Sequence, residues 1–455
     1  MIKIKLKRAV AALLCAVMLA GAFSSCASGK SAYDIAVENG FEGSVEQWLE
    51  SLRGADGKDL TVESGANISL SVDDIYNAAV KGGYTGTKEE YVREVLGIES
   101  EEDKLIRNIN RSLLSTVSVI SYFNFGSVNG PLGTSTSRSG SVASGVIVEL
   151  DKEKGDAYIV TNYHAIYEST STNKLSNDVS VYLYGLEYSD QAIPAEIVGY
   201  TVTYDIAVLK VTDSEVLKNS NAVSAEWRSS DTVMIGETVY TTGNPESQGI
   251  SSAVGTVTLD TLELEVDRAD GKGEVTMRLL RTDTSLNHGN SGGGLYDKNG
   301  KVIGIVVAKN TNTDVDEIGY VIPSDIAMRA ANNIIISKEK YNSSTIKKCL
   351  LGITVTAQNP YTETDGKTGA VLKREEVTVM ELVPNSAAYG KIFEGDIILS
   401  MEKEGDKVEA HRIFNIVDYM LTVFPGDTVN VTVLRGEEEI VIPVTFTNEA
   451  LTDVN

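Results

Sequence analysis

The chain has 455 residues, of which 42% are hydrophobic and 23% are charged. This composition is that of a folded chain rather than a disordered one, and the length exceeds what one ordinary core holds, so two to four domains are expected. Sixty-four acids against 40 bases give a net charge of −24, which disfavours nucleic acids and anionic lipid headgroups as partners because both repel it.

The N-terminus has the pattern of an export signal. Four basic residues among the first eight precede an apolar stretch of about 15 residues, which is too short to span a bilayer as a stable helix. Cys26 follows directly, and a Cys in this position resembles a bacterial lipoprotein cleavage site. Residues 1–25 are therefore predicted to be a signal peptide, and Cys26 to carry a lipid anchor. Phe23 departs from the pattern, which prefers Leu, and cleavage without lipidation after Ala22 or Ala27 is the alternative.

The cysteines predict a chain without disulfides. Cys15 leaves with the signal and Cys26 carries the lipid, so only Cys349 remains. Three scattered cysteines also form no metal site, and the sequence predicts neither a metal nor a cofactor.

An internal repeat follows the signal, within residues 26–105. The two copies, 31–54 and 74–97, align at a constant offset of 43 residues, and each has the pattern of a helix, a Gly-rich turn and a second helix. A unit this small buries little surface alone. The copies resemble small repeats of surface and phage-related proteins of Gram-positive bacteria. A spacer or wall-binding stalk and an inert linker both remain open.

From about Ser112 the chain changes to short β-rich runs separated by Gly, Asn, Asp and Ser, a pattern typical of an all-β barrel or sandwich domain. The clearest runs are Thr116–Ile120, Gly145–Leu150, Ala157–Thr161, Val179–Tyr184, Ile206–Val211, Thr238–Thr242 and Val302–Val307. The Gly-, Ser- and Thr-rich segment Ser127–Ser141 is predicted to be a flexible loop. A helix is predicted from Ser324 to about Lys340. A last unit, Leu351–Phe446, mixes strands with a helix around Ile413–Val423.

Three segments of the β-rich region carry chemistry. The run IVTNYH ends on His164, Asp205 opens the apolar run DIAVL, and Ser291 lies in the Gly-rich segment NHGNSGGG. A serine hydroxyl becomes a good nucleophile when an imidazole takes its proton, and a buried carboxylate fixes the tautomer of that imidazole. Glycines let backbone N–H groups turn towards a developing oxyanion. We expect Gly289, Asn290 and Ser291 to form this oxyanion hole, with the N–H groups of Gly289 and Ser291 as donors.

Each segment alone has an ordinary structural explanation, as a strand end, a turn residue or a hairpin loop. Together they follow the order His, Asp, Ser with spacings of 41 and 86 residues, in a chain with three histidines. His288 lies only three residues before Ser291 on the same turn and is better explained as a loop histidine, so His164 is the predicted base.

These segments resemble the HtrA (DegP-like) group of trypsin-like serine peptidases, on the runs TNYHAI, YDIAVLKV and LRTDTSLNHGNSGGGLYDKNGKVIGI. GYVIPSDIA (319–327) resembles the strand beside the substrate and the exit helix of this family. The resemblance covers roughly residues 112–447. It implies a mainly β protein, with two six-stranded β-barrels in residues 106–340 and the triad between them. His288 and Gly294 depart from the family, which usually has Pro at the first position and commonly at the second.

The resemblance also implies a primary specificity pocket made of five residues: Ser285, Leu286, Ile318, Gly319 and Tyr320. None of them is an acid, so a preference for Lys or Arg has no counter-charge, and a small or medium aliphatic residue is expected before the scissile bond. Residues 348–447 resemble a PDZ domain, a small α/β module. Its carboxylate-binding loop would contain Leu351, Gly352 and Ile353 and would hold the C-terminus of a peptide.

The sequence therefore predicts an extracytoplasmic serine endopeptidase, anchored as an outward-facing lipoprotein of a Gram-positive bacterium. It would cleave unfolded or misfolded exported proteins, bind peptide C-termini and, by resemblance, form a homotrimer. Two alternatives are a regulatory peptidase of one surface protein and a PDZ-based scaffold or chaperone with an idle protease domain.

Overall fold

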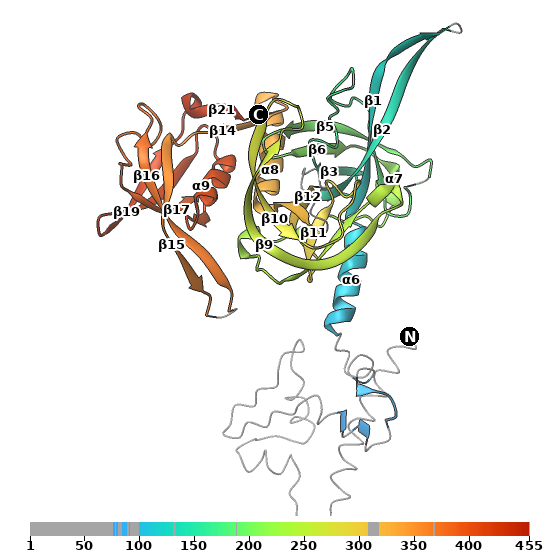
Figure 1. Cartoon of the computed structure of the whole chain (residues 1–455), viewed down its shortest axis with the longest axis horizontal. Coiled ribbons are helices and arrows are strands. Elements are labelled where there is room, and N and C mark those ends of the chain that lie inside the picture. The colour runs from blue at the N-terminus through green and yellow to red at the C-terminus, as the bar shows by residue number, and fades with distance from the viewer. Residues whose placement is uncertain are drawn as a thin grey trace, which may run out of the picture. The chain divides into compact units, whose positions relative to one another are not determined.

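The computed structural model describes residues 100–130, 133–187, 189–307, 318–366 and 369–454, and within the repeat region residues 76–77, 79–80, 84–88 and 91 (Figure 1). The predicted signal, Cys26 and the first repeat copy lie outside the described residues. The chain divides into two compact units, Met1–Lys104 and Leu105–Asn455. No helix in the described part of the chain combines the length and the apolar composition that crossing a membrane requires.

In the first unit, three aromatic residues of the second repeat copy pack together. The ring of Tyr84 lies 5.0 Å from that of Tyr91 and 6.3 Å from that of Tyr76, and Tyr91 is buried. The Tyr76 hydroxyl donates to the carbonyl of Gly86 at 3.0 Å, across the turn. Aromatic contacts at these distances are favourable beyond the area that they bury. They give this short unit a small core.

Most of helix α6 (Glu101–Leu113) belongs to the second unit and precedes a closed barrel in the strand order β1-β2-β3-β6-β5-β4, in which β1 also pairs with β4. Its strands are β1 (Thr116–Gly130), β2 (Gly133–Asp151), β3 (Asp156–Thr161), β4 (Val179–Leu183), β5 (Ile193–Thr201) and β6 (Ile206–Val211). A short helix, α7 (Glu215–Asn219), follows.

A second barrel has the order β11-β8-β9-β10-β13-β12 and is closed by pairing of β11 with β12, while the short β7 adds to β12 in parallel. Its strands are β7 (Glu226–Trp227), β8 (Thr238–Gly243), β9 (Ser251–Asp267), β10 (Glu274–Thr282), β11 (Gly294–Asp297), β12 (Lys301–Val307) and β13 (Gly319–Pro323). The prediction of two six-stranded barrels is confirmed. Each of the seven β-rich runs quoted from the sequence coincides with a strand, although the run Val179–Tyr184 extends one residue beyond β4.

One local prediction was wrong. Ser127–Ser141 is not a loop, because β1 and β2 continue through it as the two arms of a hairpin, with Ser127 paired to Thr136 and Tyr122 to Gly140. Backbone pairing that starts in the barrel is extended outwards residue by residue, and an antiparallel ladder satisfies the N–H and C=O groups whatever the side chains are. The Gly and Ser content that predicted a loop therefore did not decide the conformation.

Strand β6 shows why the two barrels pack as they do. Its side chains alternate between two cores, because successive residues of a strand point to opposite faces. Ala207 and Leu209 lie in the core of the first barrel, and Ile206 and Val208 pack with residues of the second barrel. All four are buried. Asp205, directly before β6, is thereby placed at the junction of the barrels.

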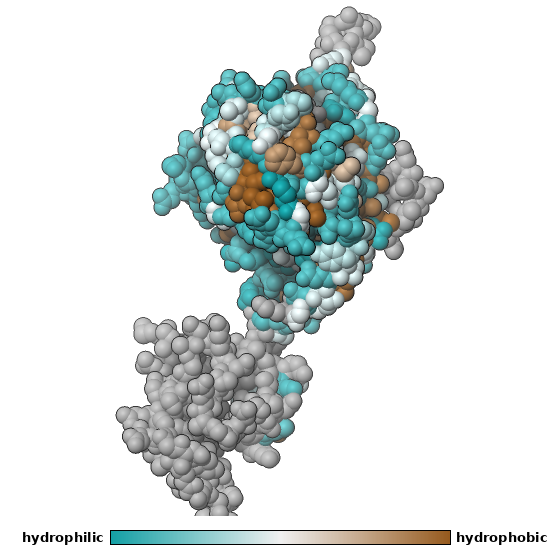
Figure 2. All heavy atoms as spheres, turned by 90° about the vertical axis from the view of Figure 1, so that its left-hand side faces the viewer, coloured by the Kyte–Doolittle hydropathy of each residue, from teal (hydrophilic) through white to brown (hydrophobic). Residues whose placement is uncertain are grey.

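Helix α8 (Ser324–Tyr341), predicted over Ser324–Lys340, leads from the second barrel to a C-terminal α/β region. That region has a sheet in the order β15-β16-β17-β19-β20, with β18 beside β17, a separate β14–β21 pair, and helix α9 (Ile413–Tyr419) where a helix was predicted. Its strands are β14 (Ile346–Cys349), β15 (Ile353–Thr364), β16 (Val371–Leu382), β17 (Ile397–Lys403), β18 (Asp406–Glu409), β19 (Thr428–Arg435), β20 (Glu438–Thr445) and β21 (Leu451–Val454). Figure 2 shows a mainly hydrophilic surface on this side of the molecule, with several separate apolar areas between the polar side chains.

The C-terminal region is held to the second barrel by a buried ion pair. Arg278 on β10 donates to the Asp418 carboxylate of α9 at 2.5 Å, and the two side chains are only 8% and 5% exposed. The Arg278 guanidinium also lies 4.0 Å from the ring centre of Phe414. Burial raises the pKa of Asp418 to about 6, although Arg278 and Arg329 act in the opposite direction. From α8, the Asn333 amide donates to the carbonyls of Lys347 and Leu421, which adds a neutral contact between the two regions.

Replacement of Arg278 by Ala should destabilise the chain, because it leaves the Asp418 carboxylate buried without a partner. The expected loss in the free energy of unfolding is about 3–5 kcal/mol at about pH 8, measured by equilibrium urea unfolding. The pKa of Asp418 is raised from its ordinary 3.8 to about 6 in the folded chain. A carboxyl with a raised pKa contributes most to the stability of the fold when it is protonated, so its contribution is smallest above pH 6. The loss should therefore be smaller at about pH 5, where the carboxyl takes up a proton.

Lys347→Ala is the matched control, because it removes a more exposed pair with Asp453. Its expected cost is about 0–1 kcal/mol. An equal cost for the two variants would contradict the assigned role of the Arg278–Asp418 pair.

Candidate active site

His164 and Asp205 meet at one end of the first barrel. Strands β3 and β6 are antiparallel neighbours, with Thr161 opposite Ala207, so the residues that follow β3 lie beside the residue that precedes β6. The Asp205 carboxylate receives two hydrogen bonds from His164, from the backbone N–H at 3.0 Å and at Nδ1 at 2.7 Å. The second bond fixes the orientation of the ring and engages Nδ1, so Nε2 is the ring nitrogen that Asp205 does not contact.

The backbone of Asp205 is fixed as well. Its φ is +49°, in the left-handed region that few residues other than Gly, Asn and Asp adopt. Its carbonyl accepts hydrogen bonds from Tyr163 N–H at 3.2 Å and from the Asn162 side-chain amide at 2.9 Å. The segment 162–164 is thereby wrapped around a buried aspartate, and the carboxylate has little freedom to turn away from the imidazole.

The imidazole is made more basic by this carboxylate. Burial of the ring opposes its charged form, but the nearby Asp205 charge and the hydrogen bond to it have the larger combined effect and raise the pKa of His164 above its ordinary 6.5. A base of this kind holds a proton more firmly than a free imidazole does and can return it to a leaving group.

Ser291 lies in a tight turn of the second barrel, and both it and Asn290 are buried. The turn is closed by backbone hydrogen bonds from Asn290 to Asn287 at 3.1 Å and from Gly293 to Asn290 at 2.9 Å. Gly292 has a φ of +83°, and a Cβ there would lie 2.2 Å from the Ser144 carbonyl and 2.4 Å from the Thr161 hydroxyl. The Ser291 turn therefore packs directly against β2 and the end of β3, three residues before His164.

Ser144 connects these parts, and sequence reasoning missed it. The Ser144 N–H donates to the Ser291 carbonyl at 2.7 Å. The Ser144 hydroxyl donates to the Gly289 carbonyl at 2.6 Å and accepts a hydrogen bond from the Asn244 N–H at 2.9 Å. The Ser144 carbonyl accepts a hydrogen bond from the Thr161 hydroxyl at 2.7 Å. The side chain is fully buried. The only sequence signal was a run of small residues, Ala143–Gly145, at the start of a predicted strand.

The peptide unit between His288 and Gly289 has a defined orientation. The His288 carbonyl accepts from Glu246 N–H at 2.7 Å. Since C=O and N–H point in opposite directions across a trans peptide, Gly289 N–H faces away from Glu246. None of the described residues accepts a hydrogen bond from this N–H. Gly289 has a φ of +97°, and a Cβ would lie 2.1 Å from the Asn244 carbonyl, so the turn requires glycine here.

Of the five residues of the predicted primary pocket, Leu286 and Gly319 are in direct contact. A Cβ on Gly319 would lie 2.5 Å from Leu286 Cδ1, so these two are in contact. Tyr320 follows on β13, Ile318 is half-buried, and Ser285 is exposed. β13 itself pairs with β10 on one side and with β12 on the other.

The three residues predicted to hold a peptide C-terminus lie between β14 and β15. Gly352 has a φ of +79°, and its carbonyl accepts from Val383 N–H at 2.9 Å and from the Ser386 hydroxyl at 3.2 Å. Leu351 is buried and Ile353 is the first residue of β15, an edge strand of its sheet. Within the described ranges, no group accepts from the N–H of Leu351 or Gly352.

The other two histidines lie elsewhere. His288 is exposed on the Ser291 turn, as expected of a loop histidine. His411 lies near the second barrel, and burial and the nearby Arg374 lower its pKa. Over the residues that the structure covers, no three His, Cys, Asp or Glu side chains are grouped closely enough to hold a metal ion.

Comparison with known proteins identifies the family. The trypsin-like peptidase domain matches residues 143–305. The Do-like serine protease HtrA of Bacillus subtilis is 30% identical over 347 residues, which are 75% of this chain and 72% of that protein. The chain belongs to the HtrA family. It is a trypsin-like serine endopeptidase with a mainly β fold.

Further HtrA relatives are more distant. The periplasmic pH-dependent serine endoprotease DegQ of Escherichia coli is 28% identical over 315 residues, or 67% of this chain and 59% of that protein. Among solved structures, the HtrA-type protease AlgW with a decapeptide is 22% identical in sequence, with a TM-score of 0.48. The matched region comprises 77% of this chain and 99% of the AlgW chain.

The effect of Asp205 on the imidazole can be measured directly in this HtrA protein, because the chain has three histidines and their resonances are easily told apart. Asp205→Asn should lower the pKa of His164, since it removes the negative charge that stabilises the imidazolium. Carbon–proton NMR of the imidazole C–H groups over a pH series measures this. The resonance of His411 should titrate at an unchanged pH and is the internal control, and an unmoved His164 titration would rule out the assigned cause.

Ser144 is predicted to position the Ser291 turn. Ser144→Ala removes two side-chain hydrogen bonds, and the cost of about 1 kcal/mol for a buried hydrogen bond corresponds to a fall in kcat of roughly five- to tenfold. KM should change little, since the pocket residues are untouched. Steady-state kinetics on an unfolded protein substrate measures both. Ser139→Ala, an exposed serine on the same strand, is the control, and an equal fall in that variant would refute the positioning role.

Proposed function

We propose that His164, Asp205 and Ser291 are the catalytic triad of this endopeptidase. The observation that carries the proposal is the 2.7 Å hydrogen bond between His164 Nδ1 and the buried Asp205 carboxylate, on loops that pack beside the Ser291 turn. In this assignment Ser291 Oγ attacks the scissile carbonyl while His164 Nε2 takes its proton. The imidazolium then protonates the leaving amine, and a water molecule, activated in the same way, releases the acyl group from Ser291.

The negative charge of the tetrahedral intermediate is assigned to the turn Gly289–Asn290–Ser291, with Gly289 and Ser291 N–H as the donors. The bond from Glu246 N–H to the His288 carbonyl supports this, because it keeps the Gly289 N–H directed away from that contact and available. Loss of one donor of this type costs about 3–4 kcal/mol of transition-state stabilisation. Asn290 is assigned to the shape of the turn, since its carbonyl accepts from Gly293.

Ser285, Leu286, Ile318, Gly319 and Tyr320 are proposed to form the primary specificity pocket. The contact between Leu286 and Gly319 supports a shallow apolar floor. None of the five carries a charge, so the residue before the scissile bond should be a small or medium aliphatic one.

The C-terminal region is proposed to be a PDZ domain that binds peptide C-termini. Two observations support it: β15 is an edge strand, to which a peptide can add as a further strand, and the Leu351 and Gly352 N–H groups have no acceptor among the described residues. These N–H groups and that of Ile353 would hold the terminal carboxylate.

We further propose that the substrates are unfolded or misfolded exported proteins, that Cys26 anchors the enzyme by lipid to the outer face of the cell membrane, and that the enzyme forms a homotrimer. The export pattern of the sequence and the family of extracytoplasmic relatives support the location. The combination of an endopeptidase with a site for chain ends supports the substrate class.

The test uses the full chain in detergent with a fluorophosphonate probe and unfolded casein. The wild type should bind the probe covalently and degrade casein, and Ser291→Ala should lose both while it still binds a peptide with a free C-terminus. Ser139→Ala, an exposed serine of β2 without an assigned role in the site, should keep probe labelling. Labelling of Ser291→Ala, or a wild type that neither reacts nor cleaves, would refute the triad.

A further inference from the structure

The segment Asn244–Gly249, directly after β8, forms a turn with an unfavourable backbone conformation. An Asn-Pro pair opens it and a glycine ends it, which is the composition of a turn. Glu246 and Ser247 have φ values of +52° and +58°, in the left-handed region that residues other than Gly, Asn and Asp rarely adopt. Both residues are exposed, so burial of their side chains does not explain the conformation. Two such residues in succession persist only where other contacts hold the turn.

Asn244 supplies these contacts. Its side-chain oxygen accepts a hydrogen bond from the Gly249 N–H at 2.8 Å, which closes the turn between its first and last residues. Its side-chain nitrogen donates to the Ser118 hydroxyl of β1 at 2.8 Å, which anchors the turn to the first barrel. Asn244 is only 3% exposed, and a hydrogen bond is strong in such surroundings because water does not compete for it. One buried amide therefore closes the turn and fixes its position.

The turn lies against the peptide unit between His288 and Gly289. The Glu246 N–H donates to the His288 carbonyl at 2.7 Å. A Cβ on Gly289 would lie 2.1 Å from the Asn244 carbonyl oxygen, so the two backbones are in direct contact. The conformation of the turn therefore sets where the Glu246 N–H stands and which way the His288 carbonyl points.

The orientation of this peptide unit decides which group faces the proposed oxyanion hole. Because Gly289 has no Cβ, its φ can take either sign, and its own side chain does not prevent rotation of the peptide unit. In the opposite orientation the His288 carbonyl would replace the Gly289 N–H at the hole, and the Gly289 N–H would face the Glu246 N–H, donor against donor. The hole would then present an acceptor to the oxyanion and destabilise it. The bond from Glu246 selects the orientation that keeps the donor in the hole.

We propose that Asn244 is a positioning residue for the oxyanion hole. By fixing the turn, it holds the Glu246 N–H on the His288 carbonyl and keeps the Gly289 N–H directed at the developing negative charge. This rests on the proposed role of Gly289 and deepens it. Asn244 acts through the turn and does not itself contact the substrate.

The test uses the full chain in detergent and an internally quenched peptide with Val before the scissile bond. Asn244→Ala removes the bond that closes the turn, so the His288–Gly289 peptide unit should hold its orientation for a smaller fraction of the time. Steady-state kinetics should show a fall in kcat of roughly five- to tenfold, the equivalent of one buried hydrogen bond. KM should stay within twofold, because the proposed specificity pocket is untouched.

A peptide boronic acid reports on the oxyanion hole directly. Its boron accepts an electron pair from Ser291 Oγ and becomes a tetrahedral anion that resembles the transition state. The inhibition constant of this compound should rise in Asn244→Ala by the same factor by which kcat falls. The pH at which kcat/KM is half-maximal should not move, because the turn contacts neither His164 nor Asp205.

Ser118→Ala is the matched control. It removes the other partner of the same buried amide but leaves the bond between Asn244 and Gly249 in place. Both variants should lower the thermal unfolding midpoint, while kcat and boronic acid binding should change only in Asn244→Ala. If Asn244→Ala fails to fold, Asn244→Ser replaces it, because its shorter side chain leaves the turn unclosed yet keeps a polar group at this position, and the same fall in kcat is expected.

A kcat within twofold of the wild type in the folded Asn244 variant would overturn the proposal, as would equal falls in the Asn244 and Ser118 variants. A fall in kcat without weaker boronic acid binding would also overturn it, because the loss would then lie outside the oxyanion hole. Each of these results leaves the triad of an active wild type intact. A wild type that neither cleaves the peptide nor binds the boronic acid would instead refute the proposed function, and the role of Asn244 with it.

Discussion

The arrangement of the active site depends on the contact between Ser144 of the first barrel and the Ser291 turn of the second. His164 and Asp205 both belong to the first barrel, whereas Ser291 belongs to the second. Their relative position is therefore set by how the barrels dock, and the 2.7 Å bond from Ser144 N–H to the Ser291 carbonyl fixes that docking at the site itself. The Ser144 hydroxyl extends the same control to Gly289, whose N–H is the proposed oxyanion donor.

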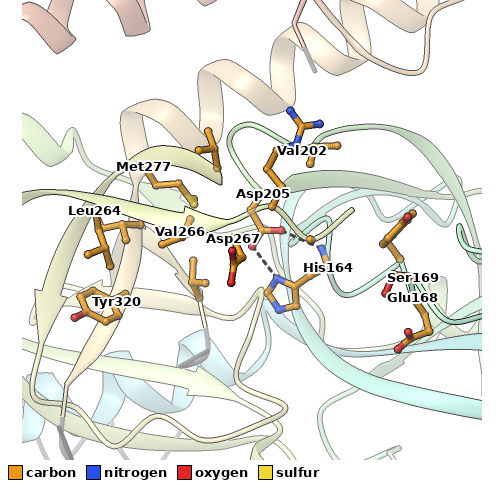
Figure 3. A pocket seen from close by; sticks show the side chains of 16 residues that line it. His164, Glu168, Ser169, Val202, Asp205, Leu264, Val266, Asp267, Met277 and Tyr320 are labelled. Carbon is orange, nitrogen blue, oxygen red and sulfur yellow. Dashed lines mark hydrogen bonds and ion pairs between the residues drawn. The ribbon is translucent and has the colours of Figure 1, made fainter. Parts of the chain in front are cut away.

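Strands β6 and β10 each contact two different parts of the molecule through their two faces, and this packing explains the position of the site. β6 sends alternate side chains into the core of the first barrel and into the interface with the second, so Asp205 at its start is held at the interface. β10 contributes Met277 and Leu279 to the cavity that His164 and Asp205 also line (Figure 3), and between them Arg278 reaches Asp418 of the C-terminal region. The period of two in a β-strand makes both arrangements a direct consequence of the fold.

The wrong prediction has its physical origin in backbone pairing. Ser127–Ser141 has the composition of a loop, but pairing that begins in the first barrel extends β1 and β2 through it as a hairpin. Side-chain composition reports on local preference and burial, but not on which backbone edge a partner strand already occupies.

The sequence by itself determined the short-range features of this HtrA protein. The runs around His164, Asp205 and Ser291 contain all three proposed catalytic residues, and the strand Ile206–Val211 and the helix that begins at Ser324 follow from apolar pattern and turn residues. Only the tertiary structure decided the rest: the role of Ser144, the docking of the β9–β10 tip on the other barrel, and the burial of Arg278 against Asp418. The contacts of Ser144 with Gly289 and of Arg278 with Asp418 join residues 145 and 140 positions apart, and no local preference of a serine or an arginine encodes such a partner.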